Sequence, residues 1–157
     1  MDTFEDSKKK GKVLSDELQD TQNKVDVRNI SISRVGIKDI KYPFDILDKD
    51  GVSQSTIGNF TMSVGLPDNV KGTHMSRFVK ILEDQKEPLS IENFDSLVVN
   101  TSDILGSDAA YISFDFTYFK KKKAPVTKVE SLLDYSINYT CEVKNNIINK
   151  YLKVIVP

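Results

Sequence analysis

Six consecutive residues, Gly72-Thr73-His74-Met75-Ser76-Arg77, bring together side chains suited to binding an anion. His74 is the only histidine of the 157 residues. The apolar residues that follow it recur at helical spacing, which predicts a helix over residues 73–85 with Thr73 as its N-cap. Free backbone N–H groups at a helix start and an arginine fork both favour phosphate or carboxylate.

The same six residues allow a purely structural interpretation, and spacing alone favours it. Thr73 would cap the helix, His74 would lie on the surface, and Arg77 would pair with a nearby carboxylate. We therefore keep four residues as candidates for substrate binding or for an interface and assign no catalytic residue. The candidates are Thr73, His74, Ser76 and Arg77.

Length, charge and hydropathy limit the class of protein. A chain of 157 residues is expected to form one domain. Its net charge of −1 argues against a nucleic-acid partner. No apolar run approaches the roughly 20 residues of a membrane span, and the polar N-terminus is no signal peptide, so no membrane partner is expected. The single cysteine favours a reducing, cytoplasmic location.

The supply of soft metal ligands is small. A catalytic zinc ion usually takes three protein ligands, most often from histidine, cysteine and carboxylates. This chain has one histidine, His74, and one cysteine, Cys141. Cys141 falls on the apolar phase of a predicted strand, so we interpret it as a core residue rather than a ligand or nucleophile. No metal ligand is assigned.

The elements that must position these residues start after a polar, lysine-rich stretch. Residues 1–25 have too little apolar surface to offset the entropy of ordering and are predicted to be a flexible tail. Residues 26–157 are predicted to form a single unit. Two strands with alternating apolar residues lie on either side of a turn at Asp50-Gly51. A bulge is expected near Lys38-Asp39, and Pro43 favours an edge strand.

Two helices and further strands complete the predicted unit. Ser90 is expected to cap the second helix, with Ile91 and Ile104 on its apolar side, and Gly106 to end it. Two strands follow, separated by a charged turn at residues 120–123, and a trailing strand covers residues 151–156. The fold class is therefore α+β: one antiparallel sheet (strand-strand-helix-helix-strand-strand) with both helices on its apolar face. The polar face is either solvated or lines the inside of an assembly.

Three stretches resemble the opening of the type IB GTP cyclohydrolases, and the resemblance covers residues 18–157. They are Asp20-Thr21-Gln22 with Asp26 and Arg28, then Ile32-Ser33-Arg34-Val35-Gly36-Ile37, and Gly72-Thr73-His74-Met75-Ser76-Arg77-Phe78. The resemblance implies the tunnelling fold, with this chain as the first of two such units in a homotetramer. It implies hydrolysis of GTP to formate and 7,8-dihydroneopterin triphosphate, the first step of tetrahydrofolate synthesis. A divalent metal (zinc, iron or manganese) activates the water in that family.

The chain departs from the family in one respect. The family's metal ligands follow in a Cys-Pro-Cys motif, a Gly-Ala-His motif and glutamates, none of which is found in these 157 residues. We therefore expect this N-terminal portion to be inactive alone and to hold no metal. Its expected partners are GTP and either further copies or a C-terminal half, with His74, Ser76 and Arg77 contacting triphosphate or the partner unit. The alternative is a non-catalytic tunnelling-fold subunit used for assembly or ligand binding.

Overall fold

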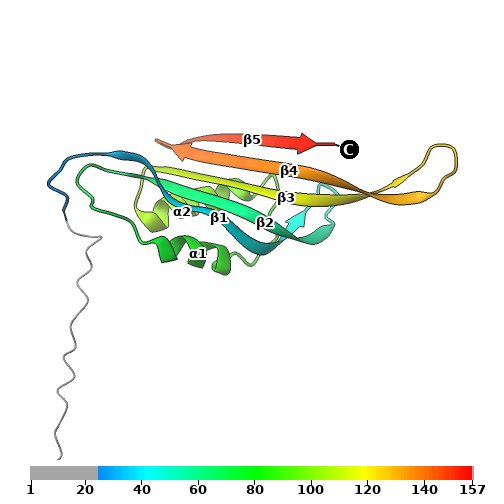
Figure 1. Cartoon of the computed structure of the whole chain (residues 1–157), viewed down its shortest axis with the longest axis horizontal. Coiled ribbons are helices and arrows are strands. Elements are labelled where there is room, and N and C mark those ends of the chain that lie inside the picture. Colours follow the sequence, from blue (N-terminus) through cyan, green and yellow to red (C-terminus); the bar gives the residue numbers. More distant parts are fainter. Residues whose placement is uncertain (1–24, 157) are drawn as a thin grey trace, which may run out of the picture.

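A computed structural model describes residues 25–156, so the predicted tail lies outside the described residues except for Val25. The described chain folds in the order strand, strand, helix, helix, strand, strand, strand (Figure 1). The elements are β1 (Ile32–Leu47), β2 (Ser53–Leu66), α1 (Met75–Asp84), α2 (Phe94–Leu105), β3 (Ala109–Lys123), β4 (Glu130–Lys144) and β5 (Ile147–Ile155). This order confirms the predicted sequence of elements.

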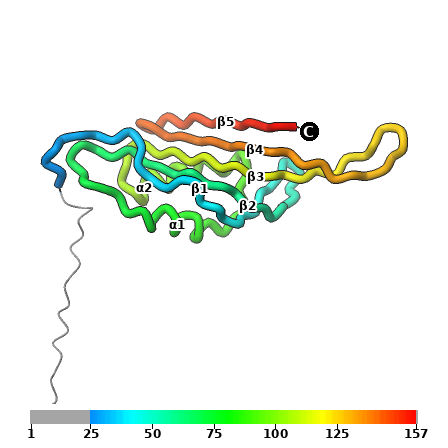
Figure 2. Tube along the Cα trace, viewed as in Figure 1, coloured from blue at the N-terminus to red at the C-terminus, as the bar shows by residue number. Residues whose placement is uncertain are grey.

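All five strands form one antiparallel sheet in which neighbours in sequence are neighbours in space. Both helices pack on the same face of that sheet, as the ribbon and the chain trace show (Figures 1 and 2). The fold is therefore the α+β tunnelling-fold unit that the sequence predicts. Within the described residues, neither helix is long and apolar enough to cross a membrane.

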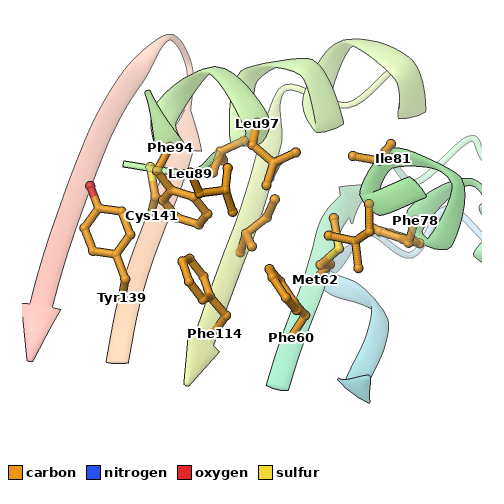
Figure 3. Close-up of a cluster of buried hydrophobic side chains, with 14 of the residues drawn as sticks. Phe60, Met62, Phe78, Ile81, Leu89, Phe94, Leu97, Phe114, Tyr139 and Cys141 are labelled. Atoms are coloured by element: carbon orange, nitrogen blue, oxygen red, sulfur yellow. The ribbon is translucent and has the colours of Figure 1, made fainter. Parts of the chain in front are cut away.

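The core fills the space between the sheet and the two helices (Figure 3). Alternate residues of β2, β3 and β4 point into it because successive side chains of a strand face opposite sides. The rings of Phe60 and Phe114 stack with centroids 4.9 Å apart, and Phe94 of α2 lies 4.8 Å from Phe114. Burying each such side chain stabilises the fold by about 1.5–3 kcal/mol. The predicted core residue Cys141 is fully buried here.

The predicted bulge and edge position of β1 are confirmed. The pairing register between β1 and β2 shifts between Ile37 and Ile40, and Asp39 in this interval has a φ of 58°. The shift brings the out-of-phase apolar residues on either side of it onto one face. Pro43 lies on β1, the edge strand of the sheet, so its missing N–H removes no ladder hydrogen bond on the outer side.

Both predicted helix starts are wrong by a few residues. The first helix begins at Met75 with His74 as its N-cap, and the His74 side chain makes no cap hydrogen bond. Thr73 is not the cap because His74 remains extended, which separates Thr73 from the first turn. The second helix begins at Phe94, whereas Ser90 exchanges hydrogen bonds with Asn93 of 2.7 and 3.2 Å in the turn before it.

The helix surface and the charged hairpin also differ from the prediction. Ile91 and Ile104, expected on the buried side of the second helix, are 56% and 43% exposed. Residues 120–123 are the end of β3 rather than a turn, and the chain turns at residues 124–129 instead. Four lysines are tolerated in this strand because they pair only with β4 and both faces of the ribbon reach solvent.

Residues with left-handed backbone angles end two further elements. Gly106 closes α2 in the left-handed conformation with a φ of 62°, as predicted. Asn145 and Asn146 turn the chain with φ values of 49° and 62°. The trailing strand starts four residues earlier than predicted, at Ile147, and pairs with β4 along its length.

Candidate functional site

A cavity of about 200 Å³ lies at the start of α1 and brings together three of the four candidate residues. Thr73, His74 and Arg77 line it, whereas Ser76 is exposed and does not line it. The opposite wall comes from the end of β2 and the C-terminus of α2. Its other lining residues are Val64, Gly65, Leu66, Pro67, Val70, Gly72, Leu105 and Gly106.

Arg77 connects the two helices at this cavity. Its Nη1 donates a hydrogen bond of 3.5 Å to the carbonyl oxygen of Ile104 near the C-terminus of α2. Its backbone N–H donates to the carbonyl oxygen of His74 at 3.1 Å. The partner of the guanidinium within residues 25–156 is thus a carbonyl rather than the carboxylate that the structural interpretation predicted. The bond is long and Arg77 is exposed, so most of its five N–H donors face solvent.

The lead-in to β1 is held against the same end of the molecule. The backbone N–H of Asp26 donates to the carbonyl oxygen of Asn69 at 3.0 Å, and Val25 forms a bridge with Val70. Arg28 donates to the Asp26 carboxylate, with Nη2 and Oδ2 2.7 Å apart. These hydrogen bonds from Arg28 lower the pKa of Asp26 to about 2. Asp26 and Arg28, two of the residues that resemble the family, therefore fix the chain just before β1.

A second polar cluster lies on the sheet face opposite the helices. Asn138 Nδ2 donates to Asp115 Oδ1 at 2.9 Å and to Ser113 Oγ at 3.1 Å, and Ser113 bonds to Thr140 at 2.8 Å. Asp115 and Asn138 also border a cavity of about 390 Å³ that is lined by Lys41 and Lys153. The polar phase of the strands predicted this face, and the side chains satisfy one another across β3 and β4.

Sequence reasoning missed one contact on the polar face. The Arg34 guanidinium of β1 lies 3.8 Å from the ring centroid of Tyr111 on β3 and 3.4 Å from the Glu142 carboxylate on β4. Arg34 thus reaches across β2 and β3 to a carboxylate on β4. Only its position in the family-like stretch at the start of β1 pointed to it, because a contact 108 residues away has no local sequence signal.

The described residues do not fit a metal centre. No group of three or more His, Cys, Asp or Glu side chains within residues 25–156 is placed to hold an ion. Cys141 is fully buried in the core, and that burial raises the pKa of its thiol to about 11. A thiol must lose its proton to bind a metal, so Cys141 is unsuited to the role. No metal-dependent step is assigned to these residues.

Comparison with known proteins gives a consistent family. A sequence profile described as type I GTP cyclohydrolase folE2 matches residues 18–157. GTP cyclohydrolase FolE2 of Vesicomyosocius okutanii is 44% identical over 140 residues, covering 89% of this chain and 53% of that protein. FolE2 of Nitrosomonas eutropha is 45% identical over 143 residues, with 89% and 53% covered. The chain therefore spans about half the length of the curated relatives it matches, and it belongs to the type I GTP cyclohydrolase FolE2 family.

Proposed function

We propose that this chain is a portion of a type IB GTP cyclohydrolase, which converts GTP and water to formate and 7,8-dihydroneopterin triphosphate. The reaction would supply tetrahydrofolate synthesis in the cytoplasm, in keeping with a lone, buried cysteine. The observation that supports this proposal is the family match over residues 18–157. The family's divalent metal, zinc, iron or manganese, would supply the activated water when bound. The described residues do not fit it, so their role is to bind and position.

We assign that positioning role to the start of α1. Thr73, His74 and Arg77 surround one cavity, and Ser76 lies exposed in the first turn beside it. The N-cap residue His74 makes no side-chain cap hydrogen bond, and the helix dipole favours an anion at this end of α1. The solvent-facing donors of Arg77 suit the bidentate recognition of a phosphate. The triphosphate of GTP, or a carboxylate of a partner unit, is the matching ligand.

Co-expression tests the proposal directly. This chain would be produced together with the part of Vesicomyosocius okutanii FolE2 that lies outside the match, and neopterin formation from GTP would be followed by fluorescence. We expect turnover by the pair and none by either piece alone. Loss of one charge-assisted bidentate contact costs about 1.5–3 kcal/mol, so Arg77→Gln should raise the Michaelis constant for GTP by about 10- to 100-fold.

The matched control is Lys80→Gln, on the same helix. Lys80 is exposed and its nearest carboxylate is Asp84 at 3.9 Å, away from the cavity. This variant removes the same charge and should leave the Michaelis constant within about twofold, since exposed pairs of this kind contribute little. Equal effects of the two substitutions would show that Arg77 acts only through overall charge.

The alternative function, a non-catalytic subunit for assembly, has its own supporting observation. All nine residues of β5 are exposed, and its outer edge has no neighbouring strand within the described chain. Such an edge favours pairing with another chain, whether a further copy or a C-terminal half. Stable assembly without neopterin formation in the co-expression experiment would favour this alternative over the enzyme.

A further inference from the structure

The last part of the β3–β4 hairpin projects from the body of the molecule as a two-stranded arm. Register pairs between β2 and β3 stop at Asn59↔Asp115, and those between β4 and β5 stop at Ser136↔Ile155. Pairing between β3 and β4 continues alone to Lys123↔Glu130. Figures 1 and 2 show this ribbon extending well past the other strands. We call residues 119–134 the arm.

The base of the arm is fixed by side chains rather than by a third strand. Gln54 of β2 accepts from the backbone N–H of Phe119 at 2.9 Å and donates to its carbonyl oxygen at 3.2 Å. The Tyr118 hydroxyl donates to Asp48 at 3.1 Å. The arm therefore has a defined direction at its root, although an isolated two-stranded hairpin is only marginally stable in water.

One face of the arm carries two apolar side chains near its base that are open to solvent. Alternation puts Phe119 and Lys121 on the face opposite Tyr118, and their register partners Asp134 and Leu132 share that face. Phe119 is 42% exposed and Leu132 is 57% exposed. Large apolar side chains held this way on a projecting ribbon favour contact with another surface.

The Cβ positions of these four residues form a rectangle whose two diagonals differ in chemistry. The register pairs Phe119↔Asp134 and Lys121↔Leu132 are its short sides. The two apolar residues therefore lie on one diagonal, and the two opposite charges lie on the other. A two-fold axis along the apolar diagonal would place Phe119 on Phe119 and Leu132 on Leu132 of a second copy. The same rotation would place each Lys121 against Asp134 of the second copy.

We propose that the arm is a self-complementary docking surface for a second copy of this chain, with the two arms crossing face to face. A two-fold interface requires one patch that complements itself, and this rectangle does so in its charges and in the placement of its apolar residues. The patch is small beside the roughly 1,200–2,000 Å² of a stable interface, so weak association in the micromolar range is expected from the arm alone. The inference is independent of the proposed chemistry and of the exposed edge of β5.

Charge reversal followed by mixing gives a sharp test. Lys121→Glu and Asp134→Lys each create two like-charge contacts in the homodimer, so each variant alone should associate at least about tenfold more weakly than the wild type. In an equimolar mixture of the two variants both contacts become attractive again. The mixture should associate within about threefold of the wild type, because specificity of this kind follows from paired charges. Sedimentation velocity over a concentration series measures all three samples.

The control variant is Lys122→Glu, which makes the same charge change on the opposite face of the arm. On its own it should associate like the wild type, and mixed with Asp134→Lys it should not restore the association of that variant. Wild-type chains that stay monomeric up to about 200 μM would overturn the inference. Single variants that associate like the wild type, or a mixture that fails to recover, would also overturn it.

Cross-linking tests the two-fold axis independently of charge. The axis brings position 132 next to its own copy, so Leu132→Cys should form a disulfide-linked dimer on mild oxidation. Ser131→Cys lies on the other face of the same strand and should remain monomeric under the same conditions. The native Cys141 is buried and should not contribute. Equal cross-linking at positions 131 and 132 would contradict the proposed face.

Discussion

At Gly36 the backbones of β1 and β2 come so close that no side chain fits between them. A Cβ atom added to Gly36 would lie 1.9 Å from the carbonyl oxygen of Met62 and 2.6 Å from the Cα atom of Ser63. Both obstacles are backbone atoms that cannot rotate away. Gly36→Ala should therefore lower the free energy of unfolding by about 3 kcal/mol or more, by forcing the strands apart. Thermal and urea unfolding of the purified variant measure this loss.

Gly65→Ala provides the matched comparison on the neighbouring strand. An added Cβ atom there would meet Ala109 Cβ at 3.4 Å, which is ordinary van der Waals contact. Its unfolding free energy should change by less than about 1 kcal/mol. If the two glycine variants were equally stable, the close approach of β1 and β2 at Gly36 would not exist in solution.

The burial of single residues follows from the alternation of apolar and polar residues along a strand. The position of a helix cap does not, because it depends on the backbone angles of one residue. Alternation alone located Cys141 in the core, because every second residue of its strand is apolar. Thr73 was assigned as the cap from its residue type, but the helix starts after His74. A cap depends on the φ and ψ of one residue, and the sequence contains no direct signal of those angles.

At the scale of elements, an ion pair ties the edge strand β5 to α2. Lys150 Nζ lies 2.7 Å from Asp95 Oδ2. The hydrogen bond from Lys150 lowers the pKa of Asp95, and the hydrogen bond to Asp95 raises the pKa of Lys150. Both groups are partly exposed, so the pair should stabilise the fold by about 0.5–1 kcal/mol.

The direction of each pKa shift fixes the pH range of that stabilisation. The lowered pKa of Asp95 gives stability that is present above its unfolded value near 3.9 and is lost as pH falls through the folded value. The raised pKa of Lys150 gives stability that is lost only as pH rises through its folded value, above about 10.4. Lys150→Met should therefore lower the unfolding temperature at pH 7, and this loss should shrink as pH falls below about 3.9 towards pH 2.

Lys153→Met is the control, because Lys153 lies on the same strand but faces the opposite side, across from Asn138. It removes the same charge from β5 without touching Asp95. Calorimetric melting of both variants at pH 2 and pH 7 separates the ion pair from general charge effects. A Lys150→Met deficit that persists unchanged at pH 2 would show that packing, rather than the ion pair, is responsible.

Elements were predictable where the pattern was strong over many residues. The order of two strands, two helices and two strands followed from alternation and helical spacing, and the structure confirms it. The four lysines of residues 120–123 predict a turn, because runs of charged residues are common in turns, but these residues are the last part of β3. That stretch is a strand because pairing with β4 supplies its hydrogen bonds, and a ribbon open on both faces need not bury its side chains.

At the scale of the whole molecule, chemistry-bearing residues are separated by the core. His74 lies at the start of α1, whereas Cys141 lies on β4 among the side chains that pack beneath α2 (Figure 3). The polar cluster of Ser113, Asp115 and Asn138 lies on the opposite face of the sheet. Short stretches of sequence were enough to reveal the resemblance to the family. The separation of these residues in space could not be predicted, because it depends on which strands lie side by side.

The dispersal leads to a prediction about metal content. The purified chain, dialysed against zinc, manganese or iron(II) and then freed of excess ion, should retain well below one ion per chain by plasma mass spectrometry. The physical reason is that the described residues offer no group of three ligands, and the Cys141 thiol, with a pKa of about 11, stays protonated and buried at neutral pH. Cys141→Ala is the control and should leave the small residual binding unchanged. Retention of one ion per chain that disappears in the Cys141→Ala variant would place a metal ligand in the core and contradict the structure.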